Sequence, residues 1–511
     1  MKLQKSIFYI AVVASCMLYG FVSQQAQAVN MRIVTTLAEL KTITGSFDQE
    51  QVRMACRQYA GDNAGGIFVW WAGSTDAADD ALTVLPNGGG GRWKRAYTGY
   101  ISPSWFGALG NGTDDHVAVQ AAFDRPEPVK FDKNYYVDAP VRIGGDCKNV
   151  DFNGYMLIGI ATTTQRDAVL EITGHSVRLN NAFVHAAFAN YKCGVHWFSV
   201  DLYHPSAFCR IMGLRIDGAI IGLQYGVFTG QTPLDAPMSE NNIYNLTGRS
   251  VEQFIRMNQP NGFLFISNST LDVCQYEWAI YTTYHTWNPS ASKCIDIADS
   301  NQLFHISQSR FIKPDDGGYV FSGPMSITDC DIQSPAKWFQ ITGGDLNLLN
   351  CTGNHTSASY GVIEVIGNVT GTCRMTGCKF TRYIAPPATP IQQYANLDFI
   401  TALDASNYRF WVTECCISDW RRHQFYKTAN PSSVALVDVT NTEFPTEDQE
   451  LNEKLYVRRF ADGTTTNIGT GTPEGVVVAV PGSQYIRTDG GTNTSFYVKQ
   501  SGTGNTGWGA K

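Results

Sequence analysis

An eight-residue pattern of apolar and polar positions recurs along most of the chain after residue 149. Each copy reads apolar, any residue, apolar, two turn-prone residues, a small or apolar residue, any residue, apolar. Successive copies begin between 21 and 40 residues apart, and the shortest interval of 21 occurs twice in a row. The copies are 150–157, 177–184, 209–216, 241–248, 264–271, 304–311, 325–332, 346–353, 373–380, 410–417 and 437–444.

This pattern predicts a coil of three short strands and three turns for each copy. Positions one and three face inward as in a strand, the turn-prone residues form a corner, and positions six and eight face inward again. A minimum interval near 21 residues is what such a coil needs to return above its own start. Stacked coils pair their backbones and bury a continuous column of side chains. We therefore predict an all-β fold, a parallel β-helix.

The sixth position is a cysteine in four successive copies, at Cys330, Cys351, Cys378 and Cys415. Stacked residues lie about 4.8 Å apart, which is within the Cα range of a disulfide, so disulfides or metal ligation are one interpretation. The other is a ladder of small buried side chains, because free cysteine is among the most buried residue types. We favour the ladder. No spacing of Cys and His fits a zinc site, and we predict neither a metal nor a cofactor.

The N-terminus predicts export. Two lysines precede an apolar run over 7–22, and Ala26 and Ala28 form the small-x-small site that signal peptidase cuts. We predict a signal peptide over 1–28, cleaved after Ala28, and a protein that is secreted, periplasmic or on the extracellular surface. Lipoprotein processing at Cys16 and a retained membrane anchor are the alternatives.

Composition narrows the classes of partner. The formal net charge is −7, with acids and bases interspersed, so nothing favours binding to nucleic acid. After the signal peptide no stretch approaches the roughly 20 apolar residues of a membrane helix, and we predict no membrane contact there. The 48 glycines and 12% aromatic residues suit tight turns and exposed rings, which stack well on sugars.

A motif precedes the first copy: residues 105–115 read Trp-Phe-Gly-Ala-Leu-Gly-Asn-Gly-Thr-Asp-Asp. A helical run follows, which Thr113, Asp114 and Asp115 are placed to cap. The motif resembles the start of the pectate-lyase-like β-helix family, seen in phage tailspikes and rhamnogalacturonases, where Asp is usual at the position of Asn111. The resemblance implies a single-stranded right-handed parallel β-helix with an N-terminal capping helix, in which Asp114 and Asp115 are structural.

Two other parts of the chain also resemble tailspikes. Residues 65–71 and 87–95 resemble the neck before the β-helix, and 473–508 resembles a small β-module that ends many tail fibres and tailspikes. Tailspikes are generally homotrimers, so the resemblance implies a homotrimer. The signal peptide departs from tailspikes, which are assembled in the host cytoplasm. The predicted order is signal peptide 1–28, neck-like β segment 29–100, β-helix 101–445, linker 446–469 and tail-fibre-like β-module 470–511.

The longest interval between copies predicts one candidate site. It follows the copy at 264–271 and combines carboxylates with aromatic rings. Rings can stack on sugars while an acid protonates the glycosidic oxygen. The alternative is that the rings pack into the next coil and the carboxylates are solvated. The candidates are Asp272 and Glu277 as catalytic acids, with Tyr276, Trp278, Tyr281, Tyr284 and Trp287 as substrate-binding residues.

The seventh position of the pattern predicts a second candidate site. Arg310, Asp331 and Lys379 occupy it in three copies, and Asp329 lies two residues before Asp331. Residues two apart on a strand share a face at roughly 6.5 to 7 Å, the short end of the range for an inverting carboxylate pair. We consider Asp329 and Asp331 as catalytic residues and the two cations as substrate-binding residues. A solvated turn with a surface ion pair is the alternative.

The second position predicts an outward row that contains Arg178, Arg210, His305 and Arg374. Arg374 with His305 could neutralise a uronate and accept a proton, as β-elimination requires. The alternative, which we favour, is an exposed surface of mixed charge. We retain His305 and Arg374 as substrate-binding candidates.

The pattern and the resemblance together imply a protein that processes polysaccharide. We predict a tailspike-like depolymerase that hydrolyses glycosidic bonds in a bacterial surface polysaccharide or another acidic polysaccharide, and prefer a glycoside hydrolase to a polysaccharide lyase. A glycan-binding protein without activity and a structural surface fibre are the alternatives, because a β-helix does not fix function.

Overall fold

A computed structural model describes most of the chain and divides it into two units. One unit holds the chain up to Thr98 with Trp105–Gly107, and the other holds Gly99–Ser104 with Ala108–Lys511. Within the described residues, no helix is long and apolar enough to cross a membrane. The described residues are 31–186, 190–201, 205–228, 238–258, 262–273, 293–297, 303–312, 319–321, 325–334, 339–341, 343–355, 363–365, 370–382, 400–402, 407–418, 426–428, 436–440, 458–459 and 464–511.

The N-terminal unit is built on a five-stranded sheet in the order β1-β2-β3-β5-β4. The first two strands pair in parallel, and the other neighbours pair antiparallel. Trp70 and Trp93 are cross-strand partners with ring centroids 5.1 Å apart, and both are buried in the core of this unit. The elements are β1 (Arg32–Val34), α2 (Leu37–Lys41), β2 (Gln51–Met54), β3 (Gly66–Trp71), β4 (Thr83–Val84) and β5 (Arg92–Ala96).

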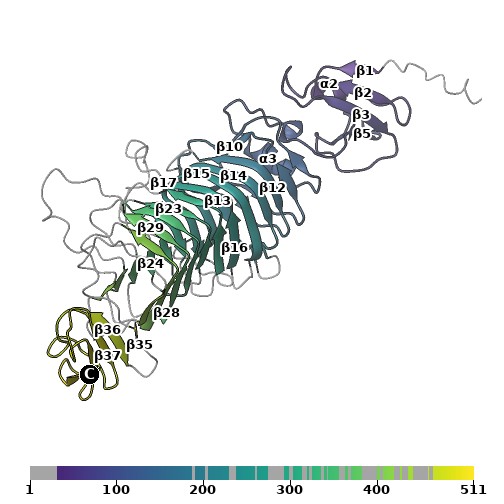
Figure 1. The fold of residues 1–511 in the computed structure, drawn as a ribbon. Coiled ribbons are helices and arrows are strands. Elements are labelled where there is room, and N and C mark those ends of the chain that lie inside the picture. The colour runs from purple at the N-terminus through teal and green to yellow at the C-terminus, as the bar shows by residue number, and fades with distance from the viewer. Residues whose placement is uncertain are drawn as a thin grey trace, which may run out of the picture. The chain divides into compact units, whose positions relative to one another are not determined.

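The second unit contains a stack of parallel strands, and its fold is the predicted parallel β-helix (Figure 1). Each coil contributes one strand segment to each of three columns. β12 (Arg178–His185) runs through the first two columns, whereas β14 (Arg210–Gly226) and β15 (Met238–Asn258) run through all three. These strands continue through corners at which a residue has positive φ, such as Gly213 on β14 and Asn245 on β15.

The remaining strands each belong to one column. The first column holds β6 (Val129–Lys130), β9 (Asn149–Asp151), β16 (Gly262–Ser267), β19 (Leu303–Ser307), β22 (Met325–Thr328), β25 (Leu346–Leu349), β28 (Thr370–Thr376), β31 (Asn407–Thr413) and β34 (Leu436–Thr440). The second holds β7 (Tyr135–Val137), β10 (Met156–Gly159), β17 (Thr270–Val273), β20 (Arg310–Ile312), β23 (Asp331–Ser334), β26 (Thr352–His355), β29 (Lys379–Arg382) and β32 (Cys416–Ser418). The third holds β8 (Val141–Ile143), β11 (Arg166–Ile172), β13 (Tyr191–Trp197), β18 (Lys293–Ile297), β21 (Tyr319–Phe321), β24 (Phe339–Ile341), β27 (Ile363–Val365), β30 (Ile400–Ala402) and β33 (Tyr426–Thr428).

The pairing registers follow the eight-residue pattern closely. From the second copy onward, each position in the first column pairs with the same position of the next copy. The first copy departs from the predicted alignment, because Val150 pairs with Leu179 and not with Val177. Leu157 nevertheless pairs with Val184 as predicted. The corner of the first copy is therefore two residues longer than the others.

The fifth position forms the corner between the first and second columns. Its φ is positive in each copy from the second to the tenth, for example 61° at Asn245, 52° at Asp329 and 64° at Gly377. Gly adopts this left-handed conformation without a steric cost, and Asn and Asp adopt it more readily than most residues. The turn-prone residues at this position therefore reverse the inward and outward alternation and return position six to the core.

The four cysteines at position six all lie in the core, as predicted, and are free thiols. The thiol of Cys351 donates to the carbonyl of Leu349, and the N–H of Cys330 donates to the Cys351 sulfur. Ser269 and Ser309 stand in the same column, where the N–H of Ser269 donates to the Ser309 hydroxyl at 3.0 Å. A small side chain that both donates and accepts thus satisfies buried corner amides from coil to coil.

The helix predicted after the Trp-Phe-Gly motif is α3 (His116–Phe123), and a 3-10 turn, η1 (Pro103–Phe106), overlaps the first two residues of the motif. α3 packs against β7 and β8. The amide of Gln120 bonds both backbone groups of Arg142 on β8, accepting from the N–H at 2.7 Å and donating to the carbonyl at 3.0 Å. This side chain satisfies backbone groups of a strand in the first coil.

Asp115 has a different structural role from the predicted one. Its side chain makes no capping bond to α3, although Asp114 accepts from the N–H of His116 at 3.0 Å. The Asp115 carboxylate instead accepts from the N–H groups of Leu109 at 2.6 Å and Tyr136 at 3.2 Å. Burial raises the pKa of Asp115 despite these bonds. Asp115 therefore connects the motif loop to β7. Its role is structural, as predicted, but it acts through these two hydrogen bonds and not as a helix cap.

The C-terminal segment forms a separate five-stranded sheet in the order β35-β36-β37-β38-β39. Its core contains Tyr485, Tyr497 and Trp508, and the Glu474 carboxylate accepts from the N–H groups of Gly507 and Trp508. The sheet begins before residue 470, inside the predicted linker, because β36 supplies the parallel partner of β37. The strands are β35 (Arg458–Arg459), β36 (Thr465–Gly469), β37 (Gln484–Arg487), β38 (Phe496–Lys499) and β39 (Trp508–Ala510).

Candidate functional site

Backbone pairing defines two rows of positions along the first column, and the side chains that the structure describes in them face outward. We call them row two and row four, after the positions of the eight-residue pattern that they contain. Because stacked residues are spaced about 4.8 Å apart, such rows form a continuous surface suited to an extended ligand. Row two runs through Asn149, Arg178, Arg210, Asn242, Phe265, His305, Ser326, Asn347, Arg374, Trp411 and Asp438. Row four runs through Asp151, Asn180, Met212, Tyr244, Ser267, Ser307, Thr328, Leu349, Thr376, Thr413 and Thr440.

A cleft of about 510 Å³ lies at the start of row two, and we call it the arginine cleft. One side is formed by the residues just before position one, which turn with positive φ, including 57° at Phe208. This turn leaves the Phe208 side chain 50% exposed at the edge of the cleft. The cleft therefore offers an aromatic face beside two cations. Its lining residues are Cys147, Asn149, Ser176, Arg178, Phe208 and Arg210.

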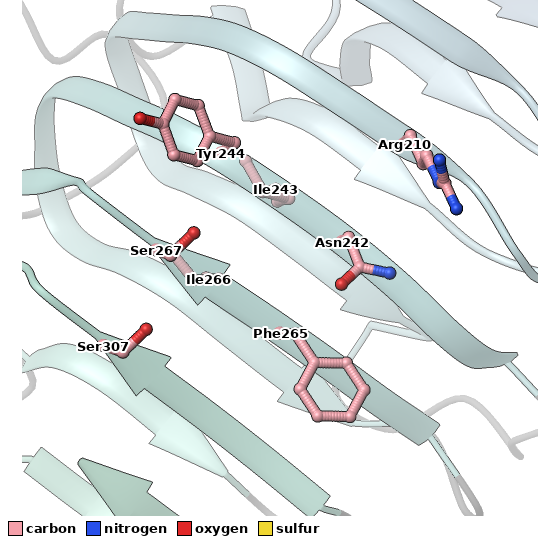
Figure 2. A pocket seen from close by; sticks show the side chains of 8 residues that line it. All are labelled: Arg210, Asn242, Ile243, Tyr244, Phe265, Ile266, Ser267 and Ser307. Carbon is pink, nitrogen blue, oxygen red and sulfur yellow. The ribbon is translucent and has the colours of Figure 1, made fainter. Parts of the chain in front are cut away.

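A second cleft of about 380 Å³ follows along the same rows, and we call it the tyrosine cleft. Figure 2 shows Asn242 between Arg210 and Phe265, with Tyr244 farther along the strand of Asn242. The Tyr244 side chain is 45% exposed, and its hydroxyl accepts from the amide of Asn268 at 3.1 Å, which holds the ring outward. The full lining is Arg210, Asn242, Ile243, Tyr244, Phe265, Ile266, Ser267 and Ser307.

The two clefts share Arg210 and therefore form one continuous face along the first column. Rings, amides, hydroxyls and guanidinium groups alternate along it, which is the chemistry that binds the apolar faces and hydroxyl groups of sugars. Among the residues that the structure describes, no Asp or Glu lines either cleft. Among the described residues, no group of three His, Cys, Asp or Glu is placed to hold a metal ion.

The outward row of the third column has a different character. Arg142, Glu171, His196 and Gln224 occupy successive rungs there. The Arg142 Nε donates to Glu171 at 2.7 Å, and the latter side chain is largely buried. The His196 ring lies 4.1 Å from the Phe198 ring, so aromatic residues cover this row.

Burial also sets the charge of His196. The imidazole is 6% exposed and its Nε2 lies 2.8 Å from the carbonyl of Gly226. Loss of solvent lowers the pKa of His196 to about 4, so the ring is neutral near pH 7. Phe228 covers its other side, with ring centroids 4.5 Å apart. His196 is therefore closed to a polymer, unlike the face of the first column.

Most of the first predicted cluster lies outside the described residues. Asp272 is on β17, where its backbone pairs with those of Arg249 and Ile312. Its predicted role as a catalytic acid stays a prediction. The positions outside the described residues are Tyr276, Glu277, Trp278, Tyr281, Tyr284 and Trp287.

The structure places Arg310, Asp331 and Lys379 of the second predicted cluster in one row, with Thr352 between Asp331 and Lys379. Arg310, Asp331, Thr352 and Lys379 occupy successive rungs, so Lys379 is two rungs, roughly 10 Å, from Asp331. The Thr352 hydroxyl lies 3.4 Å from the Asp331 carboxylate.

Asp329 stands at the exposed corner before β23, with φ of 52°. Its carboxylate accepts from the amide of Asn350 at 3.2 Å, in the next coil. This contact gives Asp329 a structural function at the corner. The predicted catalytic role of Asp329 with Asp331 stays a prediction.

His305 and Arg374 share row two, but Ser326 and Asn347 stand between them. Three rungs correspond to roughly 14 Å, so the two would contact different units of a sugar polymer. The guanidinium of Arg374 lies 4.5 Å above the Trp411 ring. The sequence reasoning did not select Phe208 or Tyr244, although the positions of Tyr244 and Phe265 in the pattern identify them as outward-facing.

Comparisons with known proteins agree with this architecture. Residues 33–98 match the family described as the phage tail protein small four-stranded β-sheet domain. The fold is similar to the gp42 tailspike of Acinetobacter phage vb_AbaP_AS12, with a TM-score of 0.52 and 11% identity over 93% of this chain and 88% of that chain. It is also similar to the tailspike protein of Acinetobacter phage vB_ApiP_P1, with a TM-score of 0.50 and 12% identity over 92% and 87%.

The enzymatically active domain of tailspike protein 4 from bacteriophage CBA120 has a TM-score of 0.50 and 12% identity over 94% of this chain and 64% of that chain. The chain spans 60% of the matched domain of tailspike protein 2 from that phage and 55% of the full-length protein. The comparison with curated proteins gives no match. The predicted resemblance to phage tailspikes is confirmed at the level of the fold, at low sequence identity.

Proposed function

We propose that this protein is a polysaccharide depolymerase that binds an extended glycan along the outer face of the first column. The observation that carries the proposal is the continuous face made by the arginine and tyrosine clefts. Exposed rings at Phe208 and Tyr244 provide stacking surfaces, and Asn242 provides hydrogen bonds to hydroxyl groups. One of the similar tailspike structures is described as an enzymatically active domain, which supports an activity on this architecture.

Hydrolysis needs a general acid and a second carboxylate on either side of the glycosidic bond. Since no carboxylate lines the two clefts, the acids of this proposal come from beside them. Glu277 and Asp272, which lie in the sequence between the cleft residues Ser267 and Ser307, are our first candidates. Asp331 with Asp329 is the second pair, and Arg310 and Lys379 would hold acidic groups of the polymer nearby.

Binding without cleavage is the second candidate function. The rings, amides and cations that the structure describes in both clefts favour it, because a binding face needs no carboxylate. A lyase is the third, in which His305 or another base removes a proton and Arg374 neutralises a uronate. These three functions differ in what they release from the polymer.

Incubating the protein with bacterial capsular, exopolysaccharide and plant acidic polysaccharides separates them. New reducing ends with shorter chains support hydrolysis, whereas absorbance of unsaturated uronates identifies a lyase. Retention of polymer with no change in chain length identifies a binding protein. If no polysaccharide is either retained or shortened, the proposed function is wrong.

Tyr244→Ala tests whether the first-column face is the site. The substitution removes an exposed ring and should weaken polymer retention about 10-fold, because one stacking contact contributes about 1 kcal/mol or more. Tyr59→Ala is the matched control, since Tyr59 is 44% exposed in the N-terminal unit. Equal retention by both variants would place binding on another surface.

Glu277→Gln and Asp331→Asn test the two acid assignments separately. Each keeps the size of the side chain and removes the charge and the acid. Loss of oligosaccharide release with unchanged polymer retention would identify the catalytic acid. Unchanged release by both variants would remove both residues from the mechanism.

Export and assembly complete the proposal. The lysines and apolar run before Ala28 support cleavage by signal peptidase, and N-terminal sequencing of the mature protein should find residue 29 first. The tailspike-like architecture supports a homotrimer. Sedimentation should then give about three times the mass of the mature chain, and a monomer mass would contradict this part.

A further inference from the structure

Arg178 and Arg210 are direct cross-strand partners on β12 and β14. Both residues are exposed, and the rungs that carry them are about 4.8 Å apart. Like charges directly opposite each other destabilise a sheet. Among the described residues, neither side chain makes a hydrogen bond or an ion pair. The repulsion between these two cations is therefore uncompensated within the described protein.

Two other arginines of the same helix, Arg215 and Arg142, are paired with carboxylates. Arg215, five residues after Arg210 on β14, bonds Asp217 through Nε at 2.8 Å and through its terminal nitrogen at 2.6 Å. Arg142 bonds Glu171 in the third column. Arg178 and Arg210 thus differ from these two arginines, because two cations face each other and no described carboxylate pairs with either.

The carboxylates near the arginine cleft are engaged elsewhere. Asp146 accepts from the N–H of His175 at 3.1 Å, and Asp151 accepts from the N–H of Asn153 at 2.8 Å and the amide of Asn181 at 3.3 Å. Neither carboxylate lines the cleft. The cleft is positively charged although the whole chain has a net charge of −7.

We infer that Arg178 and Arg210 bind an anionic group carried by a sugar, a uronate carboxylate or an acidic ester, in the arginine cleft. A guanidinium presents paired donors that match the oxygens of a carboxylate or a sulfate. An anion held by both arginines removes their repulsion, and the cleft of about 510 Å³ has room for the sugar that carries it. The Phe208 ring at the cleft edge is placed to stack on that sugar.

This inference rests on the proposed function and makes it more specific. It selects an acidic polymer and assigns its anionic group to one end of the binding face. The neutral part of the polymer then continues into the tyrosine cleft, which has no other cation than the shared Arg210. Charge at one end also orients the chain of sugars on the helix.

The first experiment measures binding of acidic polymers and their neutral counterparts to the full protein. Polygalacturonate, hyaluronate and polysialate are each compared with the carboxyl-reduced polymer, and dextran sulfate with dextran. We expect at least one acidic polymer to bind roughly 10- to 100-fold more tightly than its neutral counterpart, and more weakly as salt is raised. The dextran sulfate arm distinguishes an ester from a carboxylate.

The variant Arg178→Gln/Arg210→Gln should remove most of this preference, so that acidic and neutral polymers bind within about threefold of each other. Arg215→Gln is the matched control, because it removes the same kind of charge from the same strand on a surface outside the cleft. The control should retain the preference. An equal loss in the control would mean that net charge, and not this site, attracts the polymer.

Cys147 supplies a readout that does not depend on activity. Its thiol is exposed and lines the arginine cleft, so neutral iodoacetamide should alkylate it. The favoured acidic polymer should slow this alkylation at least about fivefold in the native protein and not in the double variant. Peptide mapping identifies the modified cysteine.

The outcomes separate the two proposals. If neutral and acidic polymers bind equally, or if the double variant keeps both preference and protection, the inference fails while the polysaccharide function stands. If no polymer binds or protects Cys147, both fail. Preference and protection that are lost only in the double variant support both.

Discussion

The first and third columns both carry arginines and aromatic rings on their outward rows, but these side chains are exposed in the first column and mostly paired or covered in the third. In the third column Arg142 is paired with Glu171, and His196 is enclosed between Phe198 and Phe228. In the first column Arg178 and Arg210 have no described partner, and the rings of Phe208 and Tyr244 stand exposed along two joined clefts. Burial and the pair of Arg142 with Glu171 indicate a structural role for the third column, whereas exposure without pairing at Arg178 and Arg210 fits the proposed binding face.

The largest expected effect comes from removing one aromatic ring beside each column, Phe228 beside the third and Phe208 beside the first. Phe228 is 8% exposed and belongs to a cluster of buried apolar side chains, whereas Phe208 is 50% exposed. Phe228→Ala should lower the free energy of unfolding by about 3 kcal/mol, because it leaves a cavity. Phe208→Ala should change it by less than about 0.5 kcal/mol. Denaturant unfolding measures both, and similar losses would contradict the assignment of the two faces.

His196 should make the protein less stable in acid. Its pKa in the folded protein is about 4, below the usual 6.5, so the unfolded chain binds the proton more readily between these values. The contribution of neutral His196 to the free energy of unfolding is fully present above about pH 6.5. It is lost as the pH drops toward 4, and the loss is about 3 kcal/mol in all. His196→Gln keeps a donor for the Gly226 carbonyl and should reduce the dependence. Parallel pH curves for the two proteins would show that His196 is not buried as described.

Breaking the paired arginine of the third column should have a smaller effect. Glu171→Ala leaves Arg142 without its carboxylate, and we expect a loss of about 1 to 2 kcal/mol, because Arg142 remains partly solvated. Glu171→Gln should lose less, since its amide oxygen still accepts a hydrogen bond. Thermal unfolding of the two variants measures the difference, and no loss in Glu171→Ala would mean that the pair does not stabilise this column.

The sequence predicted the interior of the β-helix well because the interior is strongly constrained. Positions one, three, six and eight must be apolar or small, and position five must turn with positive φ, so their spacing predicts the register. The alignment of the first copy is wrong at its first residues, because the corner around Asn153 is two residues longer than the others. The end of the copy, including Leu157, pairs as the pattern predicts.

The outer faces were harder to predict because almost any side chain is compatible with them. Arg142 and Arg178 look alike in the sequence, and only the neighbouring rungs reveal that one is paired. Phe208 was missed because a phenylalanine with positive φ has no sequence signal, as bulky residues rarely adopt that conformation. Asp115 was assigned to a helix cap because its spacing fits one, whereas the loop N–H of Leu109 competes successfully for its carboxylate.

The smallest expected effect is also the one that distinguishes the two columns most directly. If Arg178 and Arg210 repel each other without compensation, then Arg210→Gln should raise the free energy of unfolding by a few tenths of a kcal/mol at low salt. Arg215→Gln, which breaks an exposed pair with Asp217, should lower it by about the same amount. Both changes should shrink at high salt, because screening weakens surface charge interactions. The two substitutions should change the free energy of unfolding in opposite directions, because Arg215 has a carboxylate partner and Arg210 has none among the described residues. A loss of stability in Arg210→Gln would mean that the protein itself uses this arginine.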